Sequence, residues 1–358
     1  MRRAARWLAI GSGGLLVLIA ALYFARPLYL DRIYYRGPAS DHFDRERFFN
    51  PEGDTNTGVP RKFGWRKMWA MATGQEAPGW PRSIDVHPAV PPARVVGRAM
   101  RVTWIGHATV LIQTQGLNIL TDPIWSNVAG PWNLLGPHRV RAPGVRFEDL
   151  PKIDLVLVSH NHYDHMDLPT LERIWARDRP LIVTSLGNDT ILKARGMSAI
   201  AADWGGATRV RPGIWVIVER VHHWASRWGE DRNRALWSGF TVTLPGGNLF
   251  FAGDTGYGGG DWVRTVAPHG PFRLAILPIG AYHPRAIFGG NHIDPQHAVA
   301  IFRTLGARSA LGVHWGTFHL TDEAAERPPE ELRQLLIANA ISVDRFRATA
   351  PGQTWMVP

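Results

Sequence analysis

Four residues that can bind a metal lie within one short segment of the chain: His160, His162, Asp164 and His165. An apolar run at 155–158 precedes them and predicts a strand, and a helix is expected to begin at Leu168. In an extended stretch the first two histidines project to the same side, while the aspartate and the third histidine can turn toward a neighbouring position. Imidazole and carboxylate suit zinc and related ions, so this loop is predicted to serve two adjacent metals.

Three further residues have the right chemistry and each follows a strand-like run: His223, Asp254 and His314. Their common placement at strand ends is what a site on one rim of the molecule requires. The chain contains no cysteine, so any tightly held metal must be bound by His, Asp or Glu. A lone histidine is more often structural, but this set predicts a dinuclear metal centre.

Short β-rich runs and a few helical stretches are expected to position these ligands. The predicted strands are Arg101 to Trp104, Thr109 to Gln113, Asn118 to Leu120, Leu155 to Ser159, Leu181 to Thr184, Ile214 to Val218, Phe240 to Leu244, Asn248 to Ala252, Leu274 to Pro278 and Ala310 to Val313. The predicted helices are Leu168 to Ala176, Asp189 to Arg195, Pro295 to Leu305 and Pro328 to Ala338. This mixed order predicts an α/β fold of packed sheets covered by helices.

Several longer motifs resemble those of a known family. They are Trp104-Ile105-Gly106-His107-Ala108-Thr109, Leu120-Thr121-Asp122-Pro123-Ile124-Trp125-Ser126, Ser159-His160-Asn161-His162-Tyr163-Asp164-His165, Phe251-Ala252-Gly253-Asp254-Thr255-Gly256-Tyr257, Pro278-Ile279-Gly280-Ala281-Tyr282 and His314-Trp315-Gly316-Thr317-Phe318. Together they resemble the metallo-β-lactamase superfamily and, within it, the phospholipases D that hydrolyse N-acylphosphatidylethanolamine and their bacterial relatives. The resemblance runs from roughly residue 40 to 325 and implies an αββα sandwich of two packed mixed sheets flanked by helices.

The resemblance also implies roles for the site residues. His160, His162 and His223 would hold one zinc, Asp164, His165 and His314 the other, and Asp254 would bridge both. The same ligands suit other divalent metals. A hydroxide between the metals would attack phosphorus, with Asp164 and His292 as the catalytic residues and His292 close to the substrate phosphate. His223 is preferred to His222 because it directly precedes a tryptophan. One departure is His283, where the family often carries an acidic residue.

An uncharged, largely apolar run from Trp7 to Ala25 has about the length needed to cross a bilayer. We interpret it as an uncleaved N-terminal anchor, because a signal peptide would have a shorter apolar region and a small-x-small cleavage site. Three arginines precede the run and three follow it, so charge only mildly favours a cytoplasmic N-terminus and a periplasmic or extracytoplasmic catalytic domain. The predicted organisation is an anchor at 1–30, an irregular arm at 31–94 and a hydrolase domain at 95–358.

Basic and aromatic residues gather in the arm between Arg61 and Trp69, and in two loops, Trp125 to Arg141 and His222 to Trp237. The arm segment is either a solvated connector or a surface that lies among anionic lipid headgroups. The two loops are either ordinary loops packed by their indoles or an apolar, cationic lip for acyl chains and a phosphodiester head. The net charge of +10 is compatible with any anionic partner.

Three other segments have both a structural and a functional interpretation. His107 is expected either to hydrogen-bond backbone or a carboxylate, or to take part in catalysis. Asp122 either caps the turn before Pro123 or orients a ligand histidine. Gly258 to Gly260 are not part of a recognised phosphate-binding motif, so they are expected to form a turn.

The predicted function is therefore a zinc-dependent, membrane-anchored phosphodiesterase of phospholipase D type that acts on N-acylphosphatidylethanolamine-like phospholipids. Another hydrolase of the same fold, acting on a lactone, a cyclic phosphate or a soluble phosphodiester, is the first alternative. A nuclease is disfavoured by the anchor and the lack of a nucleic-acid motif. A tethered binding factor without turnover has little need of seven metal ligands. No sequence feature specifies an oligomeric state.

Overall fold

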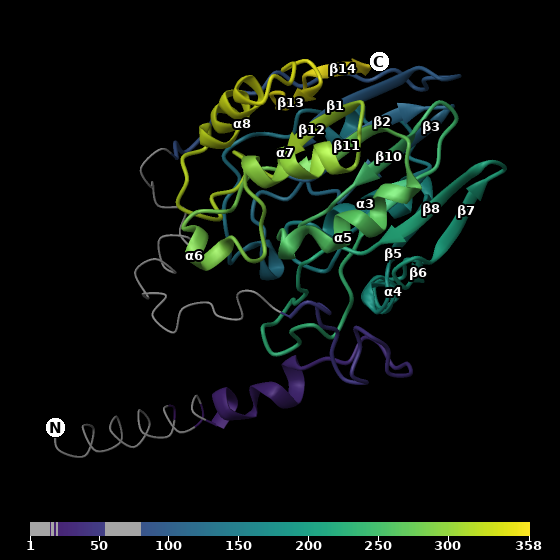
Figure 1. The fold of residues 1–358 in the computed structure, drawn as a ribbon. Coiled ribbons are helices and arrows are strands. Elements are labelled where there is room, and N and C mark those ends of the chain that lie inside the picture. The colour runs from purple at the N-terminus through teal and green to yellow at the C-terminus, as the bar shows by residue number, and fades with distance from the viewer. Residues whose placement is uncertain (1–14, 16–17, 19–20, 54–79) are drawn as a thin grey trace.

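The computed structural model describes residues 15, 18, 21–53 and 80–358, and two seven-stranded β-sheets form its centre (Figure 1). The first sheet has the order β14-β1-β2-β3-β4-β5-β6 and the second has the order β13-β12-β11-β10-β9-β8-β7. The strands of the first sheet are β1 Met100–Gly106, β2 Thr109–Thr114, β3 Leu117–Thr121, β4 Leu155–Val158, β5 Leu181–Ser185, β6 Ile200–Ala202 and β14 Thr354–Val357. Those of the second are β7 Ala207–Arg211, β8 Ile214–Glu219, β9 Gly239–Val242, β10 Asn248–Phe251, β11 Phe272–Pro278, β12 Ser309–Val313 and β13 Phe346–Arg347.

Helices cover the outer faces of both sheets. They are α3 Leu168–Asp178, α4 Asn188–Lys193, α5 Asp261–Val266, α6 Arg285–Phe288, α7 Pro295–Thr304 and α8 Arg327–Ala338, with short 3₁₀ turns at Pro131–Asn133, Phe147–Asp149, Gly258–Gly260 and Ala267–His269. Helices α3 and α4 pack on the first sheet, whereas α5, α7 and α8 belong to the cluster that includes the second sheet. The predicted αββα arrangement is confirmed.

Strand β4 shows why its sequence is apolar without a break. Leu155 and Leu157 face the core between the two sheets, while Val156 and Val158 face α3 and α4. Successive side chains of a strand point to opposite faces, so a strand buried on both sides needs an apolar residue at every position. The four-residue run therefore places His160 just beyond the end of a strand that is buried on both faces.

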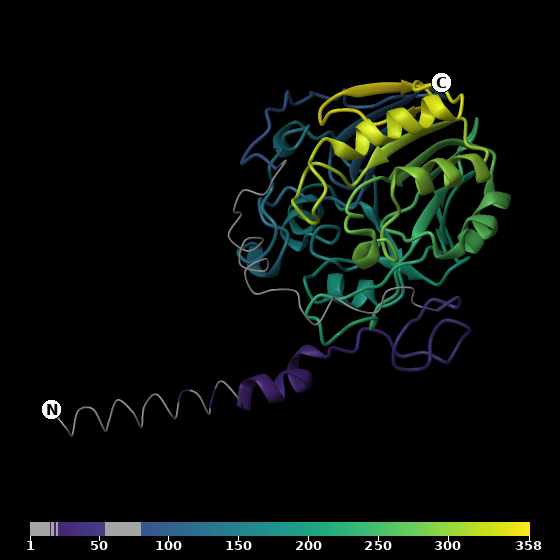
Figure 2. The same ribbon diagram turned by 60° about the vertical axis from the view of Figure 1, so that its left-hand side comes forward.

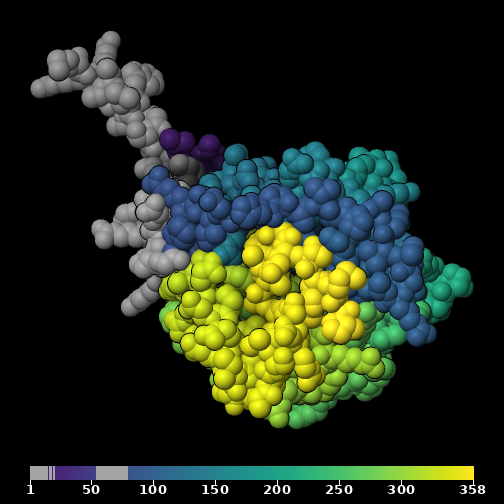
Figure 3. Space-filling model, turned by 90° about the horizontal axis from the view of Figure 1, so that it is seen from above, coloured from purple at the N-terminus to yellow at the C-terminus, as the bar shows by residue number. Residues whose placement is uncertain are grey.

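All ten predicted strands and all four predicted helices are present, with ends shifted by at most two residues. Four further strands, β6, β7, β13 and β14, and two short helices, α5 and α6, were not predicted. Strand β14 pairs with β1 from Met100↔Val357 to Thr103↔Thr354, so the C-terminal segment lies against the start of the folded domain (Figure 3). Such edge pairing depends on a partner distant in the sequence, which a local pattern does not reveal.

The chain N-terminal to the sheets takes a mostly irregular path. Residues 21–30 are helical and project from the domain (Figure 2). Beyond them the chain has isolated bridges and buries Phe43 and Phe48 in the main core. Most of the predicted anchor at Trp7 to Ala25, and all of the basic patch at Arg61 to Trp69, lie outside the described residues. Within the described ranges, none of the helices combines the length and apolar character needed to cross a membrane.

Candidate metal centre

All the predicted ligands follow strands that end at the same edge of the molecule. In the first sheet β3 and β4 are parallel, and in the second sheet β10, β11 and β12 are parallel. Two antiparallel steps, through β9, give β8 the same direction as β10. The loops after β4, β8, β10 and β12 therefore meet, and they carry the loop of 160–165, His223, Asp254 and His314 respectively.

The loop after β4 is held by Asp122, which follows β3. One carboxylate oxygen of Asp122 accepts a hydrogen bond from the backbone N–H of Ser159 at 2.7 Å, and the other accepts one from the Ser159 hydroxyl at 2.6 Å. The same carboxylate lies 2.7 Å from Nδ1 of His165. Asp122 is fully buried. It therefore fixes both the start of the loop and the orientation of one predicted ligand, which supports the functional interpretation of this residue.

Gly253 brings Asp254 close to this loop. Its φ is +61°, in the left-handed region, and a Cβ at this position would lie 2.6 Å from Cβ of Ser159. Only glycine meets both conditions without strain. The Gly-Asp-Thr sequence thus lets the chain after β10 approach the loop after β4 closely enough to place Asp254 among the histidines.

The side chains of the described residues form four overlapping groups of potential ligands, of which Asp122, His160 and His165 make one and His223, Asp254 and His292 another. The remaining two correspond to the predicted pair of sites. In one, single atoms of His160, His162 and His223 all lie within 4.8 Å of one another. In the other, the same holds for His107, Asp164, His165 and His314. All seven predicted metal ligands are thereby brought together, because Asp254 lies at the junction of the two groups.

The two carboxylate oxygens of Asp254 lie close to different histidines. Its Oδ1 lies 3.1 Å from Nε2 of His314, and its Oδ2 lies 3.1 Å from Nε2 of His165 and 3.8 Å from Nε2 of His223. Two atoms bound to one tetrahedral zinc at about 2.0–2.1 Å are separated by roughly 3.3 Å. These separations are compatible with atoms that share a metal, and the two of 3.1 Å also fit a hydrogen bond in the absence of metal.

A second, independent observation also indicates that these side chains can bind a metal. Several buried ring nitrogens and one carboxylate oxygen lack a hydrogen bond of acceptable geometry within the described part of the chain: Nε2 of His162, His165, His223 and His314, and Oδ1 of Asp254. Leaving so many polar atoms buried and unsatisfied is costly. Metal coordination would satisfy them together.

Burial and mutual repulsion control protonation at this site. Burial lowers the pKa of His162 to about 3 and holds that of His160 well below its usual value. At His314 burial also lowers the pKa, but Asp254 and Asp164 outweigh it and raise the pKa to about 9. The carboxylates likewise hold the pKa of His165 well above its usual value. Without metal, the two carboxylates are thus balanced by protons on His165 and His314, which a metal would displace.

The two predicted catalytic residues lie on the open side of the cluster. The side chains of Asp164 and His292 are each 16% exposed, whereas those of His165 and His314 are fully buried. The His292 ring stacks on His314 with centroids 5.5 Å apart, and its Nδ1 lies 3.7 Å from Oδ2 of Asp254. Burial lowers the pKa of His292 to about 4, so its imidazole is neutral near pH 7. This placement lets His292 face a substrate bound over the centre.

His107 is part of the centre, although it was not predicted as a ligand. Its Nε2 lies 2.9 Å from Oδ2 of Asp164, and its ring centroid lies 4.0 Å from that of His314. Its backbone carbonyl accepts a hydrogen bond from the N–H of His314, which ties β1 to β12. Burial lowers the pKa of His107 to about 3. The Gly-His-Ala-Thr motif indicated that His107 has a role. The motif lies far along the chain from residues 160–165, so the sequence did not show that the two segments are in contact.

Comparison with known proteins agrees with this geometry. Residues 117–315 match the sequence model of a family described as "Beta-lactamase superfamily domain". An N-acyl-phosphatidylethanolamine-hydrolyzing phospholipase D of Caenorhabditis elegans is 35% identical over 268 residues, which cover 71% of this chain and 74% of that protein. The chain belongs to the metallo-β-lactamase superfamily.

A further relative is named as a metal-dependent hydrolase, and a solved structure shares the fold. A protein of Nitratidesulfovibrio vulgaris named as a metal-dependent hydrolase is 28% identical, over 71% of this chain and 94% of that protein. An isothiocyanate hydrolase from Delia radicum gut bacteria shares the fold with a TM-score of 0.57 at 20% identity, covering 72% of this chain and 98% of that structure. The chain is accordingly an enzyme of a metal-dependent hydrolase family, with His and Asp groups able to hold metal.

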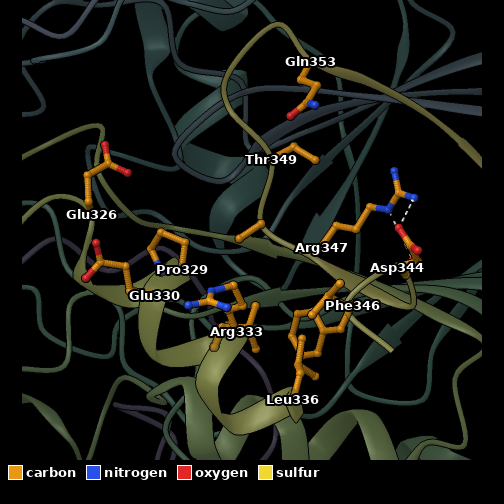
Figure 4. A pocket seen from close by; sticks show the side chains of 13 residues that line it. Glu326, Pro329, Glu330, Arg333, Leu336, Asp344, Phe346, Arg347, Thr349 and Gln353 are labelled. Carbon is orange, nitrogen blue, oxygen red and sulfur yellow. Dashed lines mark hydrogen bonds and ion pairs between the residues drawn. The ribbon is translucent and has the colours of Figure 1, made fainter. Parts of the chain in front are cut away.

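A hollow of about 910 Å³ lies beside the loop of residues 160–165, which we call the ligand loop. It is lined in part by Tyr163, which sits between His162 and Asp164 in the chain. The two predicted lip loops contribute to it through Trp132 and Trp228. Another hollow, of about 530 Å³, lies between α8 and the C-terminal strands (Figure 4). None of the predicted site residues is among those that line either hollow. The first hollow touches the ligand loop only through Tyr163, whereas the second is lined by residues of 326–353.

Proposed function

We propose that the chain is a zinc-dependent phosphodiesterase of phospholipase D type that hydrolyses N-acylphosphatidylethanolamine-like phospholipids. The position of Asp254 between two groups of potential ligands, in which four histidine Nε2 atoms lack a hydrogen bond in the described chain, carries the proposal of a dinuclear centre. The substrate class is supported by the 35% identity to a protein named for hydrolysis of that lipid. In this reaction water cleaves the bond between phosphorus and the headgroup oxygen, which yields a phosphatidic acid and an N-acylethanolamine.

The residues present would hold two ions. His160, His162 and His223 would bind one, and Asp164, His165 and His314 the other, with Asp254 shared. Two divalent ions in these positions supply Lewis acidity, which activates water near neutral pH and offsets the charge of a phosphodiester. Asp122 orients His165 and His107 contacts Asp164, so these ligands are preorganised and little rearrangement accompanies binding.

His292 is proposed to act on the substrate directly. Its neutral imidazole lies at the open side of the centre, with Nδ1 buried and without a hydrogen bond of acceptable geometry in the described chain. From there it can donate a hydrogen bond to a phosphoryl oxygen or assist proton transfer to the leaving alkoxide. Asp164, partly exposed at the same open side, would hold one of the ions.

The proposal extends to the location of the enzyme. The apolar run Trp7 to Ala25 would anchor the chain in a membrane, and the catalytic domain would face the periplasm or exterior. Arg61 to Trp69 would lie among lipid headgroups. An enzyme held at the bilayer meets a lipid substrate by lateral diffusion, which agrees with the proposed reaction.

The test is to incubate the purified full chain with N-acylphosphatidylethanolamine and with unmodified phosphatidylethanolamine, and to follow phosphatidic acid by mass spectrometry. Metal content is measured on the same sample. We expect two metals per chain and release of phosphatidic acid from the N-acylated lipid. Turnover of a lactone or a cyclic phosphodiester in its place would overturn the substrate class, and bound metal without any turnover would favour a binding role.

A further inference from the structure

Large apolar side chains stand exposed beside the hollow that contains Tyr163. Leu28 is 89% exposed, Trp132 72% and Leu134 71%. Ile33 and Leu135 are also exposed. These five residues are called the rim below. Side chains of this size are normally buried, and a cluster of them marks a surface that meets an apolar partner.

The hollow shows that the two parts of the rim lie next to each other. Arg32, Ile33 and Tyr34 line it from the N-terminal segment, and Gly130, Trp132 and Asn133 line it from the loop before His138. Between them Trp228 stands 5.9 Å from Trp132, centroid to centroid, and 5.4 Å from the guanidinium carbon of Arg32. Two residues of the rim, Ile33 and Trp132, thus line a space that touches the ligand loop at Tyr163, without any of the seven predicted ligands in its lining.

Polar contacts attach the N-terminal segment to the loop that carries Trp228. Arg26 pairs with Glu230, and Asp31 lies 2.6 Å from a guanidinium nitrogen of Arg234. The hydroxyl of Tyr34 donates a hydrogen bond of 2.7 Å to Asp231.

Asp231 in turn organises the loop that it belongs to. Its carboxylate accepts hydrogen bonds from the backbone N–H groups of Arg227 and Trp228. The helix of residues 21–30 is therefore tied to the wall of the hollow, although it projects from the domain (Figure 2).

The sequence that leads into this helix indicates which apolar partner the rim meets. The run from Trp7 to Ala25 is uncharged and apolar, and it ends three residues before Leu28, the first residue of the rim. A bilayer that holds this run must lie against the rim, because so few residues separate them. Arg32 is exposed there, while the neighbouring acids Asp31, Glu230 and Asp231 are engaged in the contacts above. An exposed cation beside tryptophan suits a phospholipid headgroup layer.

We propose that the rim inserts into the surface of a phospholipid bilayer, so that the hollow opens directly into lipid. Trp132, Leu134 and Leu135 enter the boundary between headgroups and acyl chains, and Arg32 contacts phosphate. Insertion itself does not depend on the reaction, whereas delivery of lipid to the metal centre through the hollow rests on the proposed function. The docked helix sets the orientation in which the hollow faces the membrane.

The absence of cysteine from the chain allows a direct test of insertion. The full chain with Leu134→Cys carries an environment-sensitive fluorophore at that position and is reconstituted into phosphatidylcholine vesicles with and without nitroxide-labelled lipid. The matched control is Ile337→Cys on α8, where the native side chain is 60% exposed and does not belong to the rim.

We expect a blue-shifted emission at position 134 and quenching by nitroxide lipid several-fold stronger than at position 337. Equal quenching at the two positions would overturn the proposal. If the labelled chain escapes quenching and unlabelled Leu134→Cys chains cross-link to one another, the rim contacts a second copy, which would also overturn the proposal.

Delivery is tested with Leu134→Ser/Leu135→Ser, since neither residue lines the hollow. We expect kcat/KM on vesicles to fall several-fold, and turnover of a short-chain, detergent-dispersed phosphodiester to stay unchanged. Ile337→Ser serves as the control on both substrates. Unchanged turnover on vesicles would refute delivery through the rim. If the wild-type chain turned over no lipid, the proposed function would fail while the quenching result would still decide insertion.

Discussion

His42 and the histidines of the metal centre are all buried, but they differ in what their ring nitrogens contact. His42, in the irregular segment before the sheets, has both nitrogens paired: Nδ1 lies 2.6 Å from Asp41 and Nε2 lies 2.7 Å from Asp203. Its ring stacks on Trp204 with centroids 4.4 Å apart. This histidine is satisfied by protein alone and needs no further ligand.

The metal centre contains equally buried histidines whose inner nitrogens lack such partners. His165 is typical, because Asp122 engages its Nδ1 while its Nε2 points at Asp254 without a hydrogen bond of acceptable geometry in the described chain. Burial alone therefore does not distinguish a structural histidine from a ligand. At His165 the second nitrogen does, since a polar atom left buried without a partner is costly unless something else binds it. At His160 the partner of the second nitrogen is another predicted ligand, Nδ1 of His162 at 2.7 Å.

The largest effect is expected from Asp254→Asn. Loss of the shared carboxylate should remove both metals and reduce turnover by more than about 100-fold, since even residues that only support ligands are worth roughly 10–100-fold. Metal content by mass spectrometry and phosphodiesterase activity measure the effect. Asp203→Asn, at His42, is the control and should retain both metals. A fully active Asp254→Asn with two metals would refute the bridging role.

His292→Ala should reduce kcat by about 10²–10⁴-fold, the usual contribution of a general acid or base, while both metals remain bound. Because the pKa of His292 is lowered to about 4, its imidazole in the wild type is neutral throughout pH 6 to pH 9. The loss of kcat in the variant should therefore be the same across this range. Steady-state kinetics with parallel metal analysis check this. Metal loss together with activity would show that His292 belongs to the ligands instead.

Asp122→Asn should weaken the affinity for the metal held by His165 by about 10–100-fold, because the ring orientation and basicity of that ligand depend on the carboxylate. Competition with a chelator measures the affinity. Asp167→Asn is a matched control, since Asp167 is a buried carboxylate near the same loop that bonds Ser126 and Thr170. Equal affinities in wild type and Asp122→Asn would contradict the supporting role.

The smallest effect concerns stability at His42. Burial lowers the pKa of His42, but hydrogen bonds and charge from Asp203 and Asp41 outweigh it and raise the pKa above its usual value. A raised pKa in the folded state stabilises the fold fully at pH values below the unfolded-state pKa of about 6.5. This stability is lost as the pH rises through the pKa of the folded state.

Denaturant unfolding of the metal-loaded protein at pH 5.5 and pH 8.5 tests this expectation. Wild type should lose more unfolding free energy over that interval than His42→Gln, in which the titrating group is absent. The difference between the two proteins cancels the contribution of the metal ligands. An identical pH dependence would show that His42 is not linked to folding.

Much of the fold was predictable because its determinants are local. The buried strands, such as 155–158 and 274–278, are apolar runs that no exposed element would tolerate. The short strands β6, β13 and β14 escaped prediction, since they are stabilised by pairing with residues far away in the chain. Helix α5 was also missed: it has fewer than two turns, and it directly follows Gly258 to Gly260, which predict a turn.

The sequence by itself determined which ligands are available and that a metal would bind. The spacing of His160, His162, Asp164 and His165 is local chemistry, and the lack of cysteine limits the donors to nitrogen and oxygen. Only the tertiary structure decided that Asp254 joins two groups, that Asp122 supports His165, and that His107 contacts Asp164. These contacts exist because the ends of β1, β3, β4, β10 and β12 meet at one edge, and strand order is a property of the whole sheet.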